Sequence, residues 1–274
     1  MLRSEVLLDA DGVVVEDVRC PGDRSGWSAG EPVARFGVVF ARSGVFRRSV
    51  NGVESVVDAV SGYVERPASE QRIAHPKGGD RCTSISVSPS VLESLTGGGP
   101  LLADRADLAI AVDATADLRH RQLIARIRRG ADADELVERA MAVAGGVLAD
   151  LAPVAVGAGF PSGPKRRRRL VDEVRQALHD DPELALSELA RRVGRSPFHV
   201  SRTFKQACGL TISAYRARLR VRRALERLGE GERDLARLAV DSGFADQAHL
   251  TRRLRFETGA TPARIRALLA GDPV

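Results

Sequence analysis

The sequence predicts an α+β multidomain fold: an all-β domain first, a helical connector next, and an all-α domain of two helix-turn-helix units last. Short Val-, Ile- and Phe-rich runs separated by turn pairs fill residues 5–88, which is typical of antiparallel strands. After residue 90, apolar residues recur at helical spacing. Residues 186–268 contain one pattern written twice. We expect a β domain at 1–95, a connector at 96–151, a linker at 152–164 and a helical domain at 165–274.

Turn pairs divide the β domain at regular intervals. They are Asp11-Gly12, Ser43-Gly44, Asn51-Gly52 and Ser61-Gly62. The Asn51-Gly52 pair is the strongest signal, because Asn-Gly suits the two-residue hairpin turn in which both φ angles are positive. Short antiparallel strands at even spacing predict a barrel or a sandwich.

The inward residues of such a domain would line a ligand cavity or fill a core equally well. Examples are Phe36, Val38, Phe40 and Phe46. We therefore name no ligand-binding residue.

The β domain is poor in metal ligands. Residues 1–119 contain one histidine, His75, so a site of three imidazoles cannot be built there. A soft site of Cys20, His75 and Cys82 would suit zinc or copper, but the spacing gives it no support. Cysteine is often a small buried hydrophobe, and a histidine before proline fits a loop. We expect no metal, no cofactor and no catalytic residue.

The cysteines and the apolar runs indicate in which cellular compartment the protein resides. Cys20, Cys82 and Cys208 form no C-x-x-C pair, which fits free thiols in a reducing cytoplasm. The chain opens without the apolar run of a signal peptide. Its most apolar region, residues 140–160, is broken by Asp150 and Pro153, so we expect no membrane span.

Two helical stripes follow the β domain. One consists of Leu118, Leu123, Ile124 and Ile127, and the other runs from Asp134 to Leu148. Residues 152–164 have the Pro and Gly content of a linker.

Each copy of the repeated pattern predicts a helix-turn-helix. Leu186, Leu189, Ala190 and Val193 form one apolar stripe, and Leu235, Leu238, Ala239 and Ser242 repeat it. Gly194 and Gly243 can adopt the positive φ that ends each first helix. Ser196 and Asp246 are good N-caps for the second helices. The offset between the copies changes from 49 to 50 residues, so the second turn is one residue longer.

The second helix of each copy has an apolar back and a polar front. The outer-face residues are Phe198, Ser201, Arg202 and Lys205 in the first copy, and Gln247, His249, Thr251, Arg252 and Arg255 in the second. Arginine can pair with guanine and glutamine with adenine in a DNA major groove, and hydroxyls adapt to either. His199 falls inward in the helical phase, so we expect it in the core.

Charge is divided unevenly along the chain. Residues 165–274 hold 24 Lys and Arg against 14 Asp and Glu, whereas residues 1–164 hold 18 against 22. Helix-turn-helix geometry also occurs in structural bundles, but a basic excess confined to this domain is what phosphate binding needs.

Residues 165–268 resemble the DNA-binding domain of the AraC/XylS family of bacterial transcription regulators. The motifs that carry the resemblance are Leu189-Ala190, Gly194, His199 to Lys205, Gly209, Tyr215-Arg216, Leu238-Ala239, Gly243-Phe244, Leu250 to Arg252, and Gly259 to Pro262. Leu254 and Ile265 stand where the family usually has Phe and Tyr, and both remain apolar. Part of the β domain, Val38 to Val50 and His75 to Thr83, resembles the family's cupin-like sensor domain.

The resemblance implies a ligand-responsive regulator whose two reading helices enter successive major grooves. It assigns base edges to Phe198, Ser201, Arg202, Gln247, His249 and Arg252, and phosphates to Lys205, Thr251 and Arg255. It implies double-stranded DNA, a small-molecule effector in the barrel, RNA polymerase and a second copy of the chain as partners. The connector helices would then serve dimerisation or interdomain contacts, or simply pack onto their own β domain.

Two other classes compete with this interpretation. A cupin-type metal-dependent enzyme with a helical tail would contain metal and bind no specific DNA. A constitutive DNA-binding protein would ignore small molecules. The scarcity of histidine disfavours the enzyme, and we expect the chain not to be one.

Overall fold

The computed structural model describes residues 3–22, 25–97, 109–151 and 165–270. The segment expected to be a linker, 152–164, lies outside the described residues. The strands are β1 (Arg3–Ala10), β2 (Val13–Cys20), β3 (Glu31–Pro32), β4 (Phe36–Ser43), β5 (Val45–Val50), β6 (Val53–Asp58), β7 (Ser61–Glu65), β8 (Glu70–Ala74), β9 (Asp80–Val87) and β10 (Ala109–Ala111). The helices are α1 (Pro89–Thr96), α2 (Ala114–Ile127), α3 (Ala133–Leu151), α4 (Lys165–Asp180), α5 (Leu186–Arg192), α6 (Pro197–Cys208), α7 (Ile212–Gly229), α8 (Leu235–Asp241), α9 (Gln247–Thr258) and α10 (Pro262–Ala270).

Two antiparallel sheets form the N-terminal domain, which confirms the predicted all-β domain. One sheet has the strand order β1-β2-β9-β4-β7-β10 and the other β3-β8-β5-β6. The short strand β10 joins the edge of the larger sheet, next to β7. It lies within a segment that we expected to be helical.

The turns follow the predicted pairs with one exception. Both Asp11-Gly12 and Asn51-Gly52 have two positive φ angles, as a hairpin turn of this type requires. The Ser61-Gly62 pair was wrongly predicted to be a turn, because it lies inside β7. The chain turns earlier, at residues 59 and 60, where the Asp58 carboxylate accepts a hydrogen bond from the Val60 amide (3.1 Å). An aspartate that bonds the backbone two residues on is itself a turn signal.

Strand alternation builds two cores. On β4, Val38 and Phe40 face the helical side of the larger sheet and join a core with α3. Their neighbours Val39 and Ala41 face the smaller sheet and join a second core between the sheets. Residues on opposite faces of one strand therefore contact different parts of the molecule.

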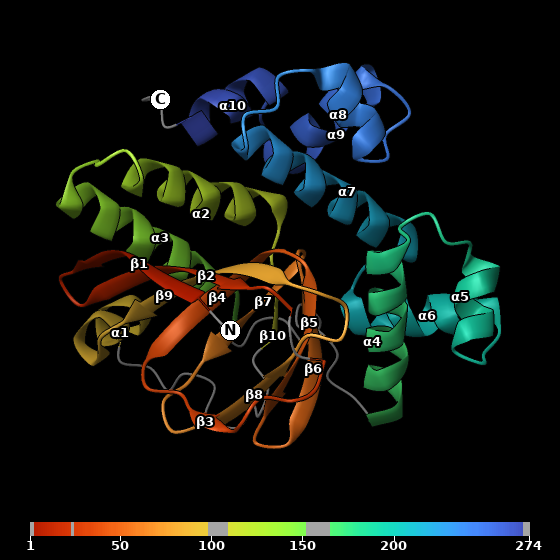
Figure 1. Cartoon of the computed structure of the whole chain (residues 1–274), viewed down its shortest axis with the longest axis horizontal. Coiled ribbons are helices and arrows are strands. Elements are labelled where there is room, and N and C mark those ends of the chain that lie inside the picture. Colours follow the sequence, from red (N-terminus) through yellow and green to blue (C-terminus); the bar gives the residue numbers. More distant parts are fainter. Residues whose placement is uncertain (1–2, 23–24, 98–108, 152–164, 271–274) are drawn as a thin grey trace.

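The two connector helices have different roles in packing. The apolar stripe of α3 packs on the larger sheet of its own domain. Helix α2 packs in two directions: Leu123 joins the core of α3, whereas Ala114 and Leu118 belong to the core of α7, α8, α9 and α10. Figure 1 shows α2 and α3 above the sheet, with α10 lying over α2.

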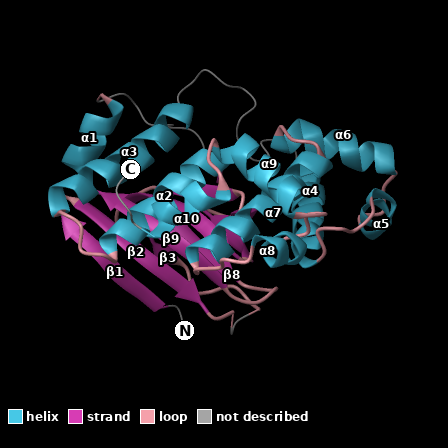
Figure 2. Cartoon of the chain, turned by 90° about the horizontal axis from the view of Figure 1, so that it is seen from above, coloured by secondary structure: helices cyan, strands magenta, loops and turns pink. Residues whose placement is uncertain are grey.

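The C-terminal domain contains the two predicted helix-turn-helix units, α5–α6 and α8–α9, joined by the long helix α7. Four residues separate α5 from α6 and five separate α8 from α9, which confirms the longer second turn. Figure 2 shows α8 and α9 alongside α7, whereas α5 and α6 lie beyond one end of it. None of the described helices combines the length and apolar character needed to cross a lipid bilayer.

Candidate nucleic-acid interface and effector pocket

The two reading helices start and end in the same way. The Ser196 side chain accepts a hydrogen bond from the His199 amide at the start of α6, and Asp246 does the same for His249 at the start of α9. Gly209 and Gly259, both with positive φ, end the helices. On the inward side, Val200, Phe204, Leu250 and Leu254 are fully buried. These caps and anchors fix which residues face outward.

The predicted outer faces are accessible. Arg202, Lys205, Arg252 and Arg255 are exposed, and no described carboxylate forms an ion pair with any of them. Phe198 is 75% exposed, which is unusual for a phenylalanine in a packed domain. Gln247 is exposed, whereas Ser201 and Thr251 are half-buried at the edge of the reading face. An exposed cation without a protein partner is free to meet a phosphate or a base edge.

The two equivalent histidines differ from each other. His199 is exposed, so its expected place in the core was wrong: at the third position of α6 its ring lies outside the packed interface, near Thr203. His249 is half-buried, and its ring packs edge-on against Phe244 at 5.3 Å between centroids. The longer second turn supplies that aromatic partner.

One residue of the second reading helix was not expected from the sequence. Phe256 is 78% exposed, and Arg253 lies over its ring at 5.3 Å while pairing with Glu257 at 2.7 Å. Phe256 lies one turn after Arg252, on the same side of α9. An aromatic residue directly after Arg255, at the end of an otherwise polar face, was the available signal.

Contact with α2 leaves the outer face of α9 open. Ala114 and Leu118 of α2 share a core with Leu250 and Leu254, which point inward from α9. Helix α2 thus contacts the second helix-turn-helix unit on the side opposite its outer face.

A buried ion pair joins α4 to the β domain. The Arg175 guanidinium lies 3.0 Å from the Asp58 carboxylate and donates to the Val56 carbonyl (2.6 Å) and to Ser61 Oγ (2.8 Å). The Tyr215 hydroxyl of α7 also bonds Asp58. Burial alone would raise the pKa of Asp58, but the Arg175 charge and the hydrogen bonds from Arg175, Tyr215 and Val60 together outweigh burial and hold that pKa below its ordinary value.

A second buried arginine joins α7 to the β domain. Arg222 donates to the carbonyls of Ala59 (2.9 Å), Val112 (2.6 Å) and Asp113 (2.7 Å) and lies 3.2 Å from the Asp117 carboxylate. Arg222 is fully buried, which a guanidinium allows when it has this many acceptors.

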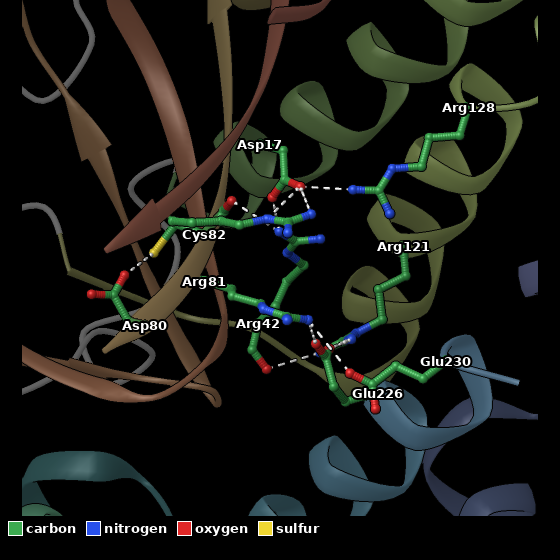
Figure 3. A network of polar contacts seen from close by, with 10 residues as sticks. Asp17, Arg42, Asp80, Arg81, Cys82, Arg121, Arg128, Glu226 and Glu230 are labelled. Carbon is green, nitrogen blue, oxygen red and sulfur yellow. Dashed lines mark hydrogen bonds and ion pairs between the residues drawn. The ribbon is translucent and has the colours of Figure 1, made fainter. Parts of the chain in front are cut away.

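Figure 3 shows a third contact, in which Glu226 of α7 and Glu230, the residue that caps its end, meet Arg81 of β9 and Arg121 of α2. Arg81 lies 3.5 Å from Glu226 and 3.4 Å from Glu230. Arg121 pairs with Glu226 and donates to the Arg42 carbonyl (3.0 Å). All three contacts involve α7, the helix that joins the reading units. We call these contacts the α7 anchors, and they are defined by Arg175 with Tyr215, by Arg222, and by Glu226 with Glu230.

A cavity of about 540 Å³ lies between the two sheets. Among the described residues that line it are Val39, Phe46, Tyr63, Ile73 and Val18. The sequence left open whether inward strand residues line a cavity or fill a core, and the structure shows both cases. Phe46 lines the cavity, whereas Phe36, Val38 and Phe40 fill the core beneath α3.

The polar lining of the cavity is acidic. Glu16, Glu31, Glu65 and Asp80 contribute carboxyl groups, and no lysine or arginine is among the described lining residues. Burial raises the pKa of Glu65, so this group resists ionisation. A pocket of this kind disfavours an anionic ligand and accepts a neutral or cationic one.

Two strands connect the cavity to the α7 anchors. On β9, Asp80 and Cys82 face the cavity while Arg81 between them faces α7. On β7, Ser61 accepts a hydrogen bond from Arg175. Further along the same strand, the side chains of Tyr63 and Glu65 form part of the cavity wall. A shift of either strand would therefore change the cavity and the α7 anchors together.

A helix-turn-helix domain model matches residues 189–267, which span both units. The chain is 30% identical over 89 residues to the "Probable transcription factor PqrA" of Proteus vulgaris, covering 32% of this chain and 73% of that protein. It is 30% identical over 122 residues to the "Bifunctional transcriptional activator/DNA repair enzyme Ada" of Escherichia coli, covering 41% of this chain. The matched part spans only 34% of the length of Ada.

Two solved structures are also similar. A single-residue variant of apo ToxT from Vibrio cholerae covers 96% of this chain and 99% of its own, at 9% identity and a TM-score of 0.44. A transcriptional regulator with an AraC-type DNA-binding domain from Chromobacterium violaceum covers 37% of this chain and 93% of its own, at 26% identity and a TM-score of 0.36.

The tandem units, their outward cations, the match to the helix-turn-helix domain model and the similarity to PqrA define a helix-turn-helix DNA-binding protein. The chain belongs to the AraC/XylS family of transcription regulators.

Proposed function

We propose that this regulator binds a specific DNA site by laying α6 and α9 into successive major grooves, under the control of a small molecule bound between the two sheets. The observation that carries the DNA contact is the set of exposed cations without described ion-pair partners at equivalent positions of both helices: Arg202, Lys205, Arg252 and Arg255. Two short helices held by one long helix suit reading centres about 34 Å apart, which is one turn of DNA.

Residue roles follow from reach and chemistry. We assign base edges to Phe198, Ser201 and Arg202 on α6, and to Gln247, His249 and Arg252 on α9. The exposed Phe198 ring suits a thymine methyl, and the two arginines suit guanine. Lys205, Thr251 and Arg255 take phosphates, which position the protein without specifying sequence. Phe256 joins the second surface as an apolar contact.

The effector acts, in our proposal, through the strands that connect the cavity with the α7 anchors. A ligand that moves β9 displaces Arg81 against Glu226, and one that moves β7 displaces Ser61 against Arg175. Both movements change how α7 is held, and α7 sets the relation of the two reading units. The acidic lining favours a neutral or cationic effector.

The remaining partners follow from the class of protein. We propose that the chain acts in the cytoplasm, where it meets promoters and RNA polymerase, and that it acts as a homodimer. In this chain α3 is covered by its own sheet and α2 by the C-terminal helices, so a second copy would use another surface.

Selection from a random duplex pool tests the DNA-binding proposal. The purified chain should enrich one motif with two half-elements about one helical turn apart. A footprint and a salt titration on the enriched duplex should then show protection on one face of the DNA. Enrichment of no motif, with binding that vanishes uniformly as salt rises, would leave only electrostatic attraction and refute specific regulation.

A further inference from the structure

Cys20, His75 and Asp80 meet at one end of the cavity between the sheets. From the sequence we expected His75 to be a loop residue and found no support for a site there. In the structure the Cys20 Sγ lies 3.4 Å from His75 Nδ1, and His75 Nε2 lies 2.6 Å from an Asp80 carboxylate oxygen. All three residues line the cavity. They come from the end of β2, the loop after β8 and the start of β9.

The backbone brings these groups together by close packing. Cys20 pairs with Asp80 across the β2–β9 ladder, so their side chains share a face. The loop that carries His75 passes so near β2 that a Cβ on Gly79 would lie 2.3 Å from the Cys20 carbonyl oxygen. Only glycine fits there. The arrangement is therefore built into the fold.

The three donor atoms lie within 4.8 Å of one another, which is also close enough to suggest a metal site. The ring orientation argues against a single ion held by all three. Cys20 contacts one nitrogen of His75 and Asp80 contacts the other, and the two nitrogens of an imidazole point away from each other. In this order a thiol faces one nitrogen of a base whose other nitrogen lies beside a carboxylate, which is the order of groups around an activated nucleophile.

The other two cysteines have no such partner. Cys82 donates its thiol hydrogen to Asp80 (3.2 Å), and burial together with the Asp80 charge raises the pKa of this thiol well above its ordinary value. Burial raises the pKa of Cys208 to about 12. Both remain protonated thiols near neutral pH, so the chain carries two internal controls for Cys20.

We propose that Cys20 is a nucleophile that captures a neutral soft electrophile of the α,β-unsaturated carbonyl class inside the cavity. His75 Nδ1 takes the proton of the Cys20 thiol as the sulfur attacks the β-carbon. A C–S bond forms and the C=C π bond breaks, and the resulting enolate recovers the proton from His75 at its α-carbon. The adduct contains every atom of both reactants, so no oxidant, reductant or further substrate is needed. Asp80 positions His75 and does not touch the ligand.

The electrophile class follows from the cavity as well as from the thiol. The carboxyl groups of the lining disfavour anions. The cavity volume of about 540 Å³ accepts a compact molecule, and the Phe46 and Tyr63 rings offer it apolar contact. Adduct formation would alter the β9 end that carries Arg81. That regulatory consequence rests on the proposed function, whereas the chemistry at Cys20 does not.

The test treats the full chain with one equivalent of N-ethylmaleimide, a neutral probe of this class, and maps the adduct by mass spectrometry. We expect a single adduct on Cys20, formed about ten-fold or more faster than on N-acetylcysteine at the same pH. His75→Asn should slow the reaction about ten-fold or more, while His179→Asn, on α4 and away from the cavity, should not. Asp80→Asn should slow it by a smaller factor.

Four results would overturn the proposal. They are equal labelling of the three cysteines, labelling only after unfolding in urea, an unchanged rate in a folded His75→Asn variant, and a tightly held zinc ion that protects Cys20. Circular dichroism of each variant separates loss of reactivity from loss of folding. Finally, DNA binding of the adduct is compared with that of the untreated chain on an enriched duplex. If no duplex is enriched, the proposed function fails while a Cys20 adduct still supports the site.

Discussion

Arg202 and Arg252 hold equivalent positions in the two repeats, and each is exposed without a described ion-pair partner. We expect Arg202→Ala and Arg252→Ala each to cost about 1–3 kcal/mol of binding free energy on the specific site and little on random DNA. The reason is that a bidentate contact to guanine is lost, while most of the phosphate attraction remains. Fluorescence anisotropy on both duplexes measures the difference.

The matched control for these variants is Arg119→Ala, an exposed arginine of α2 outside the reading faces. It should leave both affinities unchanged. Equal losses on specific and random DNA for Arg202→Ala would mean that this arginine touches only phosphate.

His120 gives the chain a predictable response to acid. Its ring is buried and stacked on Phe40 at 4.6 Å between centroids, and burial lowers its pKa from 6.5 to about 3. As pH falls below 6.5 the unfolded chain takes up a proton and the folded chain does not, so stability declines until pH approaches 3. Between pH 7 and pH 5 this one group should remove about 2 kcal/mol from the free energy of unfolding.

Urea unfolding of the His120→Phe variant checks this value. The variant keeps the stack on Phe40 and should lose less stability than the natural chain between pH 7 and pH 5. Asp58 and Asp117, whose pKa values are lowered, lose their contribution only nearer pH 4 and below, so they do not confuse the comparison. If the free energy of unfolding changed with pH in parallel for the two proteins, His120 would have an ordinary pKa in the folded chain.

At the scale of elements, the contact between α4 and β6 depends on a buried charge pair. Arg175→Met leaves the Asp58 carboxylate buried without its cation, and we expect it to cost about 3–5 kcal/mol of unfolding free energy. The double variant Arg175→Met, Asp58→Asn should recover part of that loss, because no charge is then left buried. Urea unfolding of the three proteins measures it. A double variant as unstable as Arg175→Met would show that packing, not charge, holds this contact.

The sequence predicted well those elements whose signals are local. The caps Ser196 and Asp246 and the stripes of each helix-turn-helix lie within a few residues of the structures they specify. Contacts between distant segments left no such trace. Arg175 and Asp58 are 117 residues apart, and only the folded chain shows that they meet.

The same reasoning explains what was missed at the sites. His75 was judged by its neighbour Pro76, and its relation to Cys20 depends on a loop pressed against β2. Phe256 was overlooked because apolar residues on a helix usually point inward. The predicted outer faces of α6 and α9, in contrast, needed only the helical period.

At the scale of the whole molecule, the β domain and the helical domain share cores. Val60 belongs to a core with Val171 of α4, and Leu118 to one with Leu225 of α7. We therefore expect the described parts to unfold in one calorimetric transition. Arg222→Met removes the hydrogen bonds that join α7 to the β domain, and it should broaden this transition or split it in two. Two separate transitions in the natural chain would mean that the domains are independent.

The α7 anchors restrict how this architecture can be recombined. A chimaera that joined this helical domain to another sensor would place Arg175 and Arg222 opposite surfaces that lack Asp58 and the accepting carbonyls. Two unsatisfied guanidinium groups would then lie in the new junction. Grafting therefore succeeds only when the turn at residues 56–61 and the segment at residues 112–117 are transferred with the reading units, so the exchangeable module is larger than the DNA-binding domain itself.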